Sequence, residues 1–510
     1  MTHQRPNQFV EAFADPRPHA VVIGSGFGGL AAAVRLGARG YRVTVLERLD
    51  QPGGRARMFE QDGFRFDAGP TIITMPQLFE ELWALCGKRL SDHVTLKSLD
   101  PFYTLRFEDG TVFRGTADPD LMRAEVAKFS PEDVAGHERL LKISERCFDI
   151  AFTQMADTPF PTLTSMARSL PALLGLRAYR SVYDLVASHI KDERLRIALS
   201  FHPLFLGGNP MQSSAALFLV AHLEREHGVH YAMGGFNALV RGLVDLIEDQ
   251  GNAVLTSSGV GEIRVENGRA VGVTLEDGLT IDADVVVSNA DVGTTYTKLI
   301  PAEHRRRWTD KKVARTNFSM SLLVWYFGTD RQYPDVDHHT IMMAPRYCGL
   351  LKDIFKNKTL ADDFSLYLHR PTATDPSMAP EGCDAFYVLS PVPNLDGDTD
   401  WEAMAEPFRQ RIEAHLESTV LPGLGTSIVT SRMLTPLDFR DELQSVKGSA
   451  FGIEPRLTQL AWFRPHNKSE DIDNLFIVGA GTHPGAGVPG VLSAARILDK
   501  VVPDAVPVSR

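Results

Sequence analysis

The chain is 510 residues long, carries a formal net charge of −11 at pH 7, and is 44% hydrophobic and 23% charged. This length predicts two or three domains, and the composition excludes a disordered or fibrous protein. The negative charge argues against nucleic acid as a partner. It also does not attract an anionic membrane, so any contact with a membrane must come from a local patch of the surface.

Cysteine spacing and the chain ends indicate the cellular compartment. The four cysteines lie far apart without CxxC spacing, which predicts incidental buried thiols and neither a disulfide framework nor a metal site: Cys86, Cys147, Cys348 and Cys383. Residues 1–20 contain no apolar run, so we expect no secretory signal. The uncharged stretch 475–495 contains five glycines and two prolines and is not predicted to span a membrane. We therefore expect a cytoplasmic protein.

The first motif is a strand, a glycine turn and a helix. An apolar run at 20–23 stops at the turn 24–29, a helical pattern follows from Leu30, and a second strand at 41–46 ends in an acid. In such a unit the glycines allow a tight turn, close approach of the backbone to a pyrophosphate and close helix packing, while the acid binds a ribose. The predicted dinucleotide-binding residues are Gly24, Gly26, Gly28, Gly29 and Glu47.

The next segment distinguishes FAD from NAD. Residues 51–57 read QPGGRAR, where paired glycines and flanking arginines suit a second approach of backbone and positive charge to a diphosphate. This string resembles the GG motif of the FAD-dependent amine oxidase and phytoene desaturase superfamily, and residues 66–71, FDAGPT, resemble its flavin-proximal loop. The resemblance implies that FAD is bound by Arg48, Gly53, Gly54, Arg55, Gly69, Pro70 and Thr71.

A second glycine-rich segment lies near the C-terminal end. Residues 474–495 read as a buried strand, a glycine loop and a helix that starts near Pro489. The positive end of that helix could face the flavin pyrimidine, where negative charge accumulates on reduction. The predicted contacts with the cofactor are Gly479, Ala480, Gly481, Gly487 and Val488.

The string GAGTHPGAGVPG at 479–490, together with 448–455 and 461–467, makes the resemblance more specific. It is similar to the bacterial phytoene desaturase family, and segments 200–210, 234–240 and 288–291 extend the similarity over nearly the whole chain. The family implies an FAD enzyme at a membrane surface that introduces successive double bonds into 15-cis-phytoene and isomerises it towards all-trans products. Hydride passes to flavin N5, and oxygen or a quinone accepts the electrons.

The fold class expected is α/β, with a Rossmann-like FAD-binding domain of the GR2 type and an inserted α+β substrate domain that contains a helical, membrane-facing part. Residues 252–289 read as short strands with turns at 266–268 and 276–278, and the resemblance places Val260, Asn289 and Ala290 at the dinucleotide. The FAD-binding domain is expected to comprise 1–75, 245–295 and 465–510, and the substrate domain 76–244 and 296–464.

Desaturation removes a hydride and a proton from neighbouring carbons, but no dyad or cluster in the sequence identifies a proton acceptor. The catalytic residues stay unassigned, and the candidates are His202, His338, His339, His466 and Arg168. A C40 hydrocarbon must come from lipid through a long apolar tunnel. Its candidate lining is Phe201, Phe205, Leu206, Phe218, Leu219, Trp325, Tyr326, Phe327, Trp462 and Phe463.

Residues 161–190 are predicted to form a peripheral membrane patch at the tunnel mouth, on the inner membrane. The segment carries three arginines against Asp184, a local net charge opposite to that of the chain: Arg168, Arg177 and Arg180. The side chains expected to enter the interface are Leu170, Leu173, Leu174, Leu176, Tyr179 and Tyr183. An ordinary helical pair inside the substrate domain is the alternative, because Pro171 interrupts the pattern.

Two other functions remain open at the level of sequence. A related enzyme of the same fold would be a hydroxycarotenoid desaturase, a carotenoid isomerase or an amine oxidase, although no aromatic cage for an amine is evident. A non-enzymatic prenyl-lipid escort protein would share the fold without using FAD. The sequence also does not distinguish neurosporene from lycopene as the product.

Overall fold

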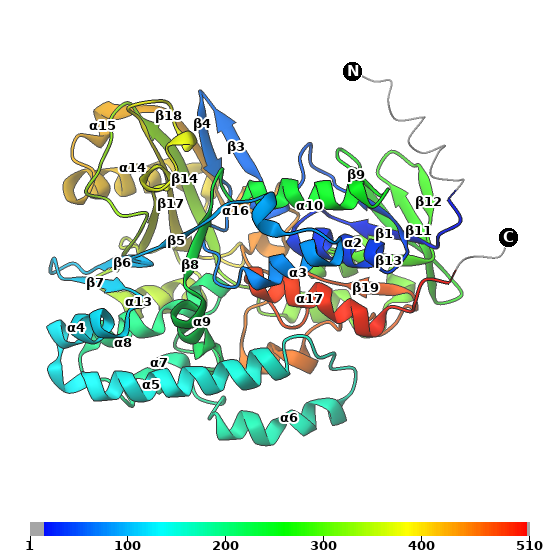
Figure 1. The fold of residues 1–510 in the computed structure, drawn as a ribbon, viewed down its shortest axis with the longest axis horizontal. Helices are drawn as coiled ribbons and strands as arrows, with labels where there is room; N and C mark the ends of the chain where they lie inside the picture. Colours follow the sequence, from blue (N-terminus) through cyan, green and yellow to red (C-terminus); the bar gives the residue numbers. More distant parts are fainter. Residues whose placement is uncertain (1–14, 507–510) are drawn as a thin grey trace.

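A computed structural model describes residues 15–506 (Figure 1). Residues 1–14, on which most of the expectation about a secretory signal rests, lie outside this range, as do the outer ends of the predicted segments 1–75 and 465–510. None of the helices within 15–506 combines the length and the apolar character needed to cross a bilayer.

The dinucleotide motif lies at the centre of a five-stranded parallel sheet of order β19-β13-β1-β2-β9. Its strands come from three distant parts of the chain: β1 (His19–Ile23), β2 (Arg42–Leu46), β9 (Ala253–Leu255), β13 (Val285–Ser288) and β19 (Leu475–Ile477). Every residue of β1 is buried, because both faces of the sheet are covered. The predicted strands at 20–23 and 41–46 are confirmed within one residue.

The two covers of this sheet differ. Ala20 and Val22 pack with helices α2 (Phe27–Ala38), α3 (Gln77–Leu85), α10 (Asn237–Asp249) and α17 (Val488–Val501). Val21 and Ile23, which point to the opposite face, pack with the antiparallel strands β10 (Val260–Glu266), β11 (Arg269–Leu275) and β12 (Thr280–Asp282). The turns of this meander lie at the predicted positions, 267–268 and 276–279.

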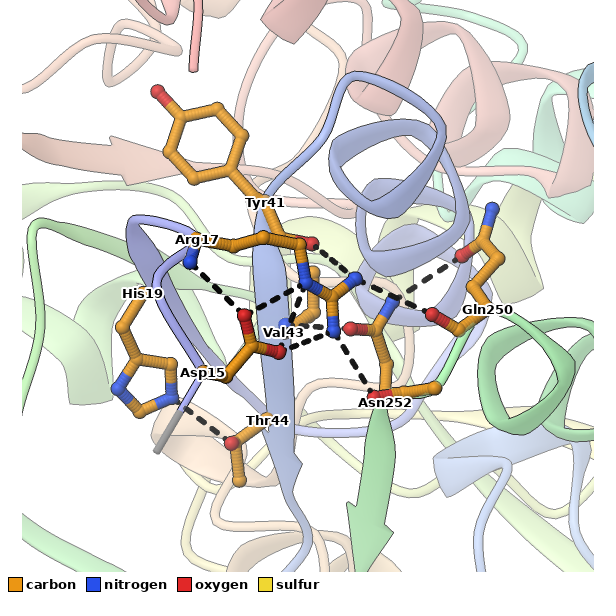
Figure 2. A network of polar contacts seen from close by, with 9 residues as sticks. Asp15, Arg17, His19, Tyr41, Val43, Thr44, Gln250 and Asn252 are labelled. Carbon is orange, nitrogen blue, oxygen red and sulfur yellow. Dashed lines mark hydrogen bonds and ion pairs between the residues drawn. The ribbon is translucent and has the colours of Figure 1, made fainter. Parts of the chain in front are cut away.

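A polar network fastens one end of this sheet (Figure 2). The Arg17 guanidinium donates to Asp15 at 2.6 Å and to the carbonyls of Gln250 and Gly251 at 3.3 and 3.2 Å. The side-chain oxygen of Asn252 accepts a hydrogen bond from the Val43 amide at 2.9 Å. The segment that leaves α10 is thereby tied to β2, which helps to hold the distant part of the chain in register.

A second sheet of seven strands lies in the other half of the molecule, in the order β18-β14-β17-β16-β15-β6-β7 (Figure 1). All neighbouring strands are antiparallel except β15 and β6. The strands are β6 (Tyr103–Arg106), β7 (Val112–Gly115), β14 (Ser321–Thr329), β15 (His339–Met342), β16 (Leu366–His369), β17 (Asp384–Val392) and β18 (Ile428–Leu434). Leu323, Trp325 and Phe327 of β14 pack in one core with α14 (Trp401–Thr419).

A group of helices lies below the two sheets in this view (Figure 1). They are α4 (Pro119–Phe129), α5 (Val134–Cys147), α6 (Leu163–Gly175), α7 (Val182–Ala187), α8 (Glu193–Ser200) and α9 (Leu219–His227). The shorter elements are β3 (Met58–Gln61), β4 (Phe64–Asp67), β5 (Leu96–Leu99), β8 (Val229–Ala232), α11 (Val292–Thr294), α12 (Asp310–Arg315), α13 (Tyr347–Lys352), α15 (Leu424–Ser427) and α16 (Pro436–Asp441).

The cysteines depart from the prediction. All four are free, as expected, but Cys147 alone is buried, Cys86 and Cys383 are half-buried, and Cys348 is exposed. The prediction of four buried thiols was therefore wrong, because spacing in the sequence carries no information on the side of an element that a single thiol occupies.

Candidate flavin and substrate site

One cavity of about 590 Å³ extends from the carboxyl ends of the parallel strands to the second sheet. At one end its wall includes Ile23, Leu46 and Asn289, which end or follow strands of the first sheet, and at the other Val324 and Leu389 of the second. A crevice at the carboxyl ends of parallel strands is where open α/β sheets bind dinucleotides. The cavity therefore joins a position suited to a cofactor to a space lined by strands of the second sheet.

Of the twenty residues predicted to bind the cofactor, nineteen line this one cavity. They are Gly24, Gly26, Gly28, Glu47, Arg48, Gly53, Gly54, Arg55, Gly69, Pro70, Thr71, Val260, Asn289, Ala290, Gly479, Ala480, Gly481, Gly487 and Val488. Gly29 is not on the wall. A Cβ at that position would lie 2.0 Å from the Gly24 carbonyl oxygen, so Gly29 closes the turn against the helix.

The turns require glycine for two reasons, the backbone conformation at Gly24 and the lack of space at Gly28. Gly24 has φ +88°, the left-handed region that favours glycine. A Cβ on Gly28 would lie 2.5 Å from Asn289 Oδ1 and 3.0 Å from the Gly479 amide nitrogen. Three turns, after β1, β13 and β19, thus approach one another through main chain and the single side chain of Asn289.

Two helices begin at the cavity wall without a capping side chain. Gly26 is the N-cap of α2 and Gly487 is the N-cap of α17, and neither helix has a side-chain hydrogen bond at its N-cap. Unsatisfied amides and the positive end of the helix dipole attract anionic groups. The predicted helix start near Pro489 is confirmed, since α17 begins at Val488.

The predicted ribose ligand, Glu47, also holds the glycine turn. Its Oε2 accepts hydrogen bonds from the Ser25 amide at 2.9 Å and from the Ser25 hydroxyl at 2.6 Å, and its Oε1 accepts one from the Leu49 amide at 2.9 Å. The side chain is buried but reaches the cavity wall. Glu47 thus couples the end of β2 to the turn after β1.

The arginines of the QPGGRAR segment differ in their contacts. Arg57 is paired with Glu442, whereas Arg55 donates to the Ser445 hydroxyl at 2.8 Å and its Nε has no partner among the described residues. Burial lowers the pKa of Arg55, and the nearby Asp291 carboxylate opposes that shift. A half-buried arginine whose Nε is a buried, free donor on the cavity wall fits a diphosphate. Together with the two uncapped helices and the glycine cradle, it makes the site fit FAD.

The other end of the cavity is apolar. Its walls come from alternate residues of β14, β15 and β17 and from segments near α6, α9 and α16; among them are Leu322, Val324, Ile341, Met343, Leu389, Leu173, Leu223 and Phe439. Four predicted tunnel residues are on the wall, namely Phe201, Phe205, Leu206 and Leu219. Phe218, Tyr326, Trp462 and Phe463 do not line it, and Trp325 and Phe327 lie on the opposite face of β14.

Glu224 is a carboxylate on the wall that the sequence analysis missed. It is 4% exposed, accepts a hydrogen bond from the Tyr103 hydroxyl at 2.8 Å, and lies 3.0 Å from His202 Nε2. The other wall carboxylates belong to the cofactor end: Glu47 binds the glycine turn, Asp291 caps α11, and Glu442 pairs with Arg57. Glu224 and Glu226 both lie on α9, and the sequence alone gives no reason to prefer one of them as a site residue. Burial was the distinguishing signal, and the sequence does not contain it.

None of the five candidates for the proton acceptor lines the cavity. His202 contacts Glu224, His338 and His339 lie in a buried histidine cluster, Arg168 is exposed on α6, and His466 lies 3.2 Å from the Trp462 carbonyl oxygen. A histidine outside this set, His483, is on the wall. Burial lowers the pKa of His483 to about 4.

The predicted flavin-proximal loop is anchored by tyrosines of the second sheet. Thr71 Oγ1 lies 2.6 Å from the Tyr367 hydroxyl, and the Tyr326 hydroxyl donates to the Ala68 carbonyl at 2.7 Å. Asp67 Oδ1 accepts a hydrogen bond from the Phe236 amide at 2.7 Å, and burial raises the pKa of this carboxyl to about 7. The loop is therefore positioned jointly by both halves of the molecule.

Comparison with known proteins agrees with this geometry. Residues 27–497 match the family described as flavin containing amine oxidoreductase. The chain belongs to this family. It is 51% identical over 96% of each chain to a phytoene desaturase (neurosporene-forming) from Cereibacter sphaeroides, and 47% identical over 93% of this chain and 97% of the other to a phytoene desaturase (lycopene-forming) from Pantoea ananas. A solved oxidoreductase structure from Methanosarcina mazei has a TM-score of 0.64 at 19% identity, covering 94% of this chain and all of that one.

Membership of the family confirms three predictions. The chain resembles the phytoene desaturases as expected, it is a flavin-dependent oxidoreductase, and its cofactor is FAD. The expected α/β architecture is confirmed at the level of the flavin amine oxidase-type fold.

Proposed function

We propose that this enzyme is an FAD-dependent phytoene desaturase that introduces successive double bonds into 15-cis-phytoene. The observation that carries the proposal is one continuous cavity, which has a main-chain cradle with Arg55 at one end and an apolar wall from the second sheet and neighbouring helices at the other. Bound FAD supplies a hydride acceptor for carbon–hydrogen bonds that no side chain could oxidise. The two relatives above are named for the same reaction and differ in their product.

The cofactor is held, in this proposal, by the nineteen predicted residues on the wall. The N-terminus of α2 and the Arg55 guanidinium receive the diphosphate, Glu47 receives the ribose, and Val260 borders the adenine. The N-terminus of α17 supplies positive potential where reduction adds negative charge. The chain segments 1–75, 245–295 and 465–510 are proposed as the parts of this domain, and 76–244 and 296–464 as the substrate domain.

Glu224 is the residue we propose as the proton acceptor. It is the wall carboxylate that does not serve the cofactor end. The Tyr103 hydroxyl at 2.8 Å and His202 Nε2 at 3.0 Å hold its Oε2, so the carboxylate keeps one orientation in an otherwise apolar surrounding. Replacing Glu224 by Gln should lower the rate of phytoene turnover at least about a hundredfold while flavin content stays unchanged. Unchanged turnover would remove Glu224 from the mechanism.

The α6 region supports a peripheral membrane contact at the mouth of the cavity. Leu163, Leu170 and Leu174 are exposed on one side of α6, while Met166 and Leu173 line the cavity. Phe463 in the adjoining segment is 44% exposed. A thin apolar wall between cavity and solvent is a suitable route for a hydrocarbon that arrives from lipid.

Not every residue predicted for this patch takes part. Leu176 is 5% exposed and is therefore not available to a bilayer, and Tyr183 is half-buried and donates its hydroxyl to Glu193 at 2.5 Å. Arg168 and Arg177 are exposed, and Arg180 donates to the Asp184 carbonyl at 2.9 Å. The patch we propose consists of Leu163, Leu170, Leu174, Tyr179, Phe463, Arg168 and Arg177, resting on the cytoplasmic face of the inner membrane.

The patch is tested by replacing Leu170 and Leu174 together with Glu. The variant should sediment less with anionic liposomes and turn phytoene over more slowly, with flavin content unchanged. Leu279 is 45% exposed, against 49% for Leu170, but lies between β11 and β12, and its replacement by Glu is the control. Full liposome binding by the double variant would show that the membrane contact lies elsewhere.

The proposed reaction is tested with phytoene in liposomes, oxygen or a quinone, and no added pyridine nucleotide. We expect neurosporene or lycopene to form under these conditions. Pyridine nucleotide should not be needed, because the cavity has one dinucleotide cradle and FAD occupies it in this proposal. Strict dependence on NAD(P) would contradict the proposed acceptor. Conversion of a hydroxycarotenoid but not of phytoene would favour a related desaturase, and a flavin-free protein that carries prenyl lipid unchanged would favour an escort protein.

A further inference from the structure

Three buried histidines from neighbouring strands of the second sheet form a cluster away from the cavity. His338 precedes β15, His339 begins β15, and His369 ends β16, where it is the register partner of His339. One ring nitrogen of each lies within 4.8 Å of those of the other two. The exposed fractions are 7% for His338 and 1% for the other two. The positions of the three rings are compatible with ring packing alone as well as with ligand binding. The hydrogen bonds of the ring nitrogens distinguish the two.

The ring nitrogens are only partly satisfied. His339 Nδ1 donates to the Phe102 carbonyl at 3.0 Å, which leaves Nε2 as the atom with a lone pair. His338 Nδ1 lies 2.7 Å from Thr374 Oγ1. Within residues 15–506, Nε2 of His338 and Nε2 of His339 have no hydrogen-bond partner, and the His369 ring has none beyond the backbone of His338 beside it. Buried polar atoms without partners are unfavourable, and so many in one place indicate a missing ligand.

We propose that His338, His339 and His369 bind a divalent metal ion of the type that prefers imidazole, with Zn²⁺ as the ion that fits best. Hydrogen bonds at Nδ1 orient two of the rings, as second-shell partners do in metal sites. The fourth position of a tetrahedral ion would be taken by a water molecule, as in other sites with three histidine ligands. Three nitrogen ligands and one oxygen ligand suit tetrahedral zinc.

The geometry requires a modest closure of the cluster. Zinc–nitrogen bonds of about 2.0–2.1 Å place tetrahedral ligands roughly 3.4 Å apart. Since the nitrogens already lie within 4.8 Å, rotation of the rings has to bring the widest pair about 1.4 Å closer. The nearest cation in sequence, Arg370, is paired with Asp384 at 3.2 Å, so its charge is compensated.

The ion would have a structural role. None of the three histidines lines the cavity, but the His339 ring lies 5.6 Å from that of Tyr367, whose hydroxyl contacts Thr71. An ion at the cluster would fasten β15, β16 and the Phe102 segment, and so support the tyrosine that positions the loop proposed to lie beside the flavin.

The test is the metal content of the purified, flavin-loaded protein after expression in zinc-supplemented medium, measured by mass spectrometry of the elements and by zinc X-ray absorption. We expect about one zinc per chain, with nitrogen ligands near 2.0–2.1 Å and imidazole scattering. His369→Gln should lose at least about nine-tenths of the zinc, because only two of the three protein ligands remain. His137→Gln, at a buried histidine of α5 outside the cluster, should retain it.

Several outcomes would overturn the site. They are substoichiometric zinc together with no uptake when the protein is titrated with zinc, full zinc retention in the His369 variant, and a shell containing sulfur. If the His369 variant does not fold, the absorption spectrum of the unmodified protein decides alone, since the proposal requires imidazole ligands there.

Discussion

The two ends of the cavity are built from different material. At the cofactor end the wall is largely main chain, and the turns approach so closely at Gly28 and Gly479 that a single added methyl group would clash with Asn289. At the apolar end the wall is made of side chains that alternate along strands, such as Leu322 and Val324 of β14. A main-chain wall fixes one ligand shape, whereas a side-chain wall can be repacked and adapts to substrate length. The first end should therefore fail abruptly on substitution and the second gradually.

The largest effect is expected for Gly29→Ala. The added Cβ would lie 2.0 Å from the Gly24 carbonyl oxygen, so the turn must open. The amides at the start of α2 would then no longer point at the diphosphate. We expect FAD affinity to fall at least about a hundredfold, which corresponds to the ~3 kcal/mol that severe overpacking costs. The measurement is the flavin-to-protein ratio by absorbance. Gly175→Ala, where no atom lies within 4 Å of the new Cβ, is the matched control and should keep its flavin.

A smaller effect is expected at the apolar end for Val324→Trp. The larger ring would enter the cavity and displace the hydrocarbon from the reacting position, which should lower phytoene turnover about tenfold. Flavin content should remain normal. Val429→Trp, at a position of β18 that is 52% exposed, supplies the same change outside the cavity. Loss of flavin in the Val324 variant would contradict the division of the cavity into two ends.

The extent to which the sequence predicted the site follows the same division. The glycines and Glu47 belong to a turn whose backbone conformation is local, so their spacing carried the prediction. Wall residues such as Val324 depend on the face of a strand that points inward. The run at 321–329 is buried along its whole length and shows no alternation, which is why Trp325 and Phe327 were placed on the wrong side.

Two further features could not be predicted for the same reason. The contact between Glu224 and Tyr103 joins residues 121 positions apart, and the pairing of His339 with His369 depends on strand register. Both need the tertiary structure. In contrast, the helix start at Val488 and the turns of the β10–β12 meander are encoded by local proline and glycine residues and were predicted correctly.

The smallest effect concerns Asp67, which lies where the two halves of the molecule meet. Burial raises its pKa from 3.8 to about 7, so the folded protein binds a proton that the unfolded chain releases between these values, and stability falls as pH rises through this window. Asp67→Asn should remove this slope. The difference in Tm between the variant and the unmodified protein should increase by about 2–4 °C, in favour of the variant, from pH 4 to pH 7, and should stay constant above pH 7. Parallel Tm profiles for the two proteins would show that the carboxyl titrates normally.

The central claim is that one cavity holds FAD and the hydrocarbon in contact. It is tested most directly by mixing the oxidised, flavin-loaded protein anaerobically with liposomes that contain 15-cis-phytoene, while flavin absorbance and carotenoid absorbance are followed together. The account predicts loss of flavin absorbance in step with one new double bond per flavin, without pyridine nucleotide, and recovery of the flavin when oxygen or a quinone is admitted. A flavin that stays oxidised beside bound phytoene would contradict it.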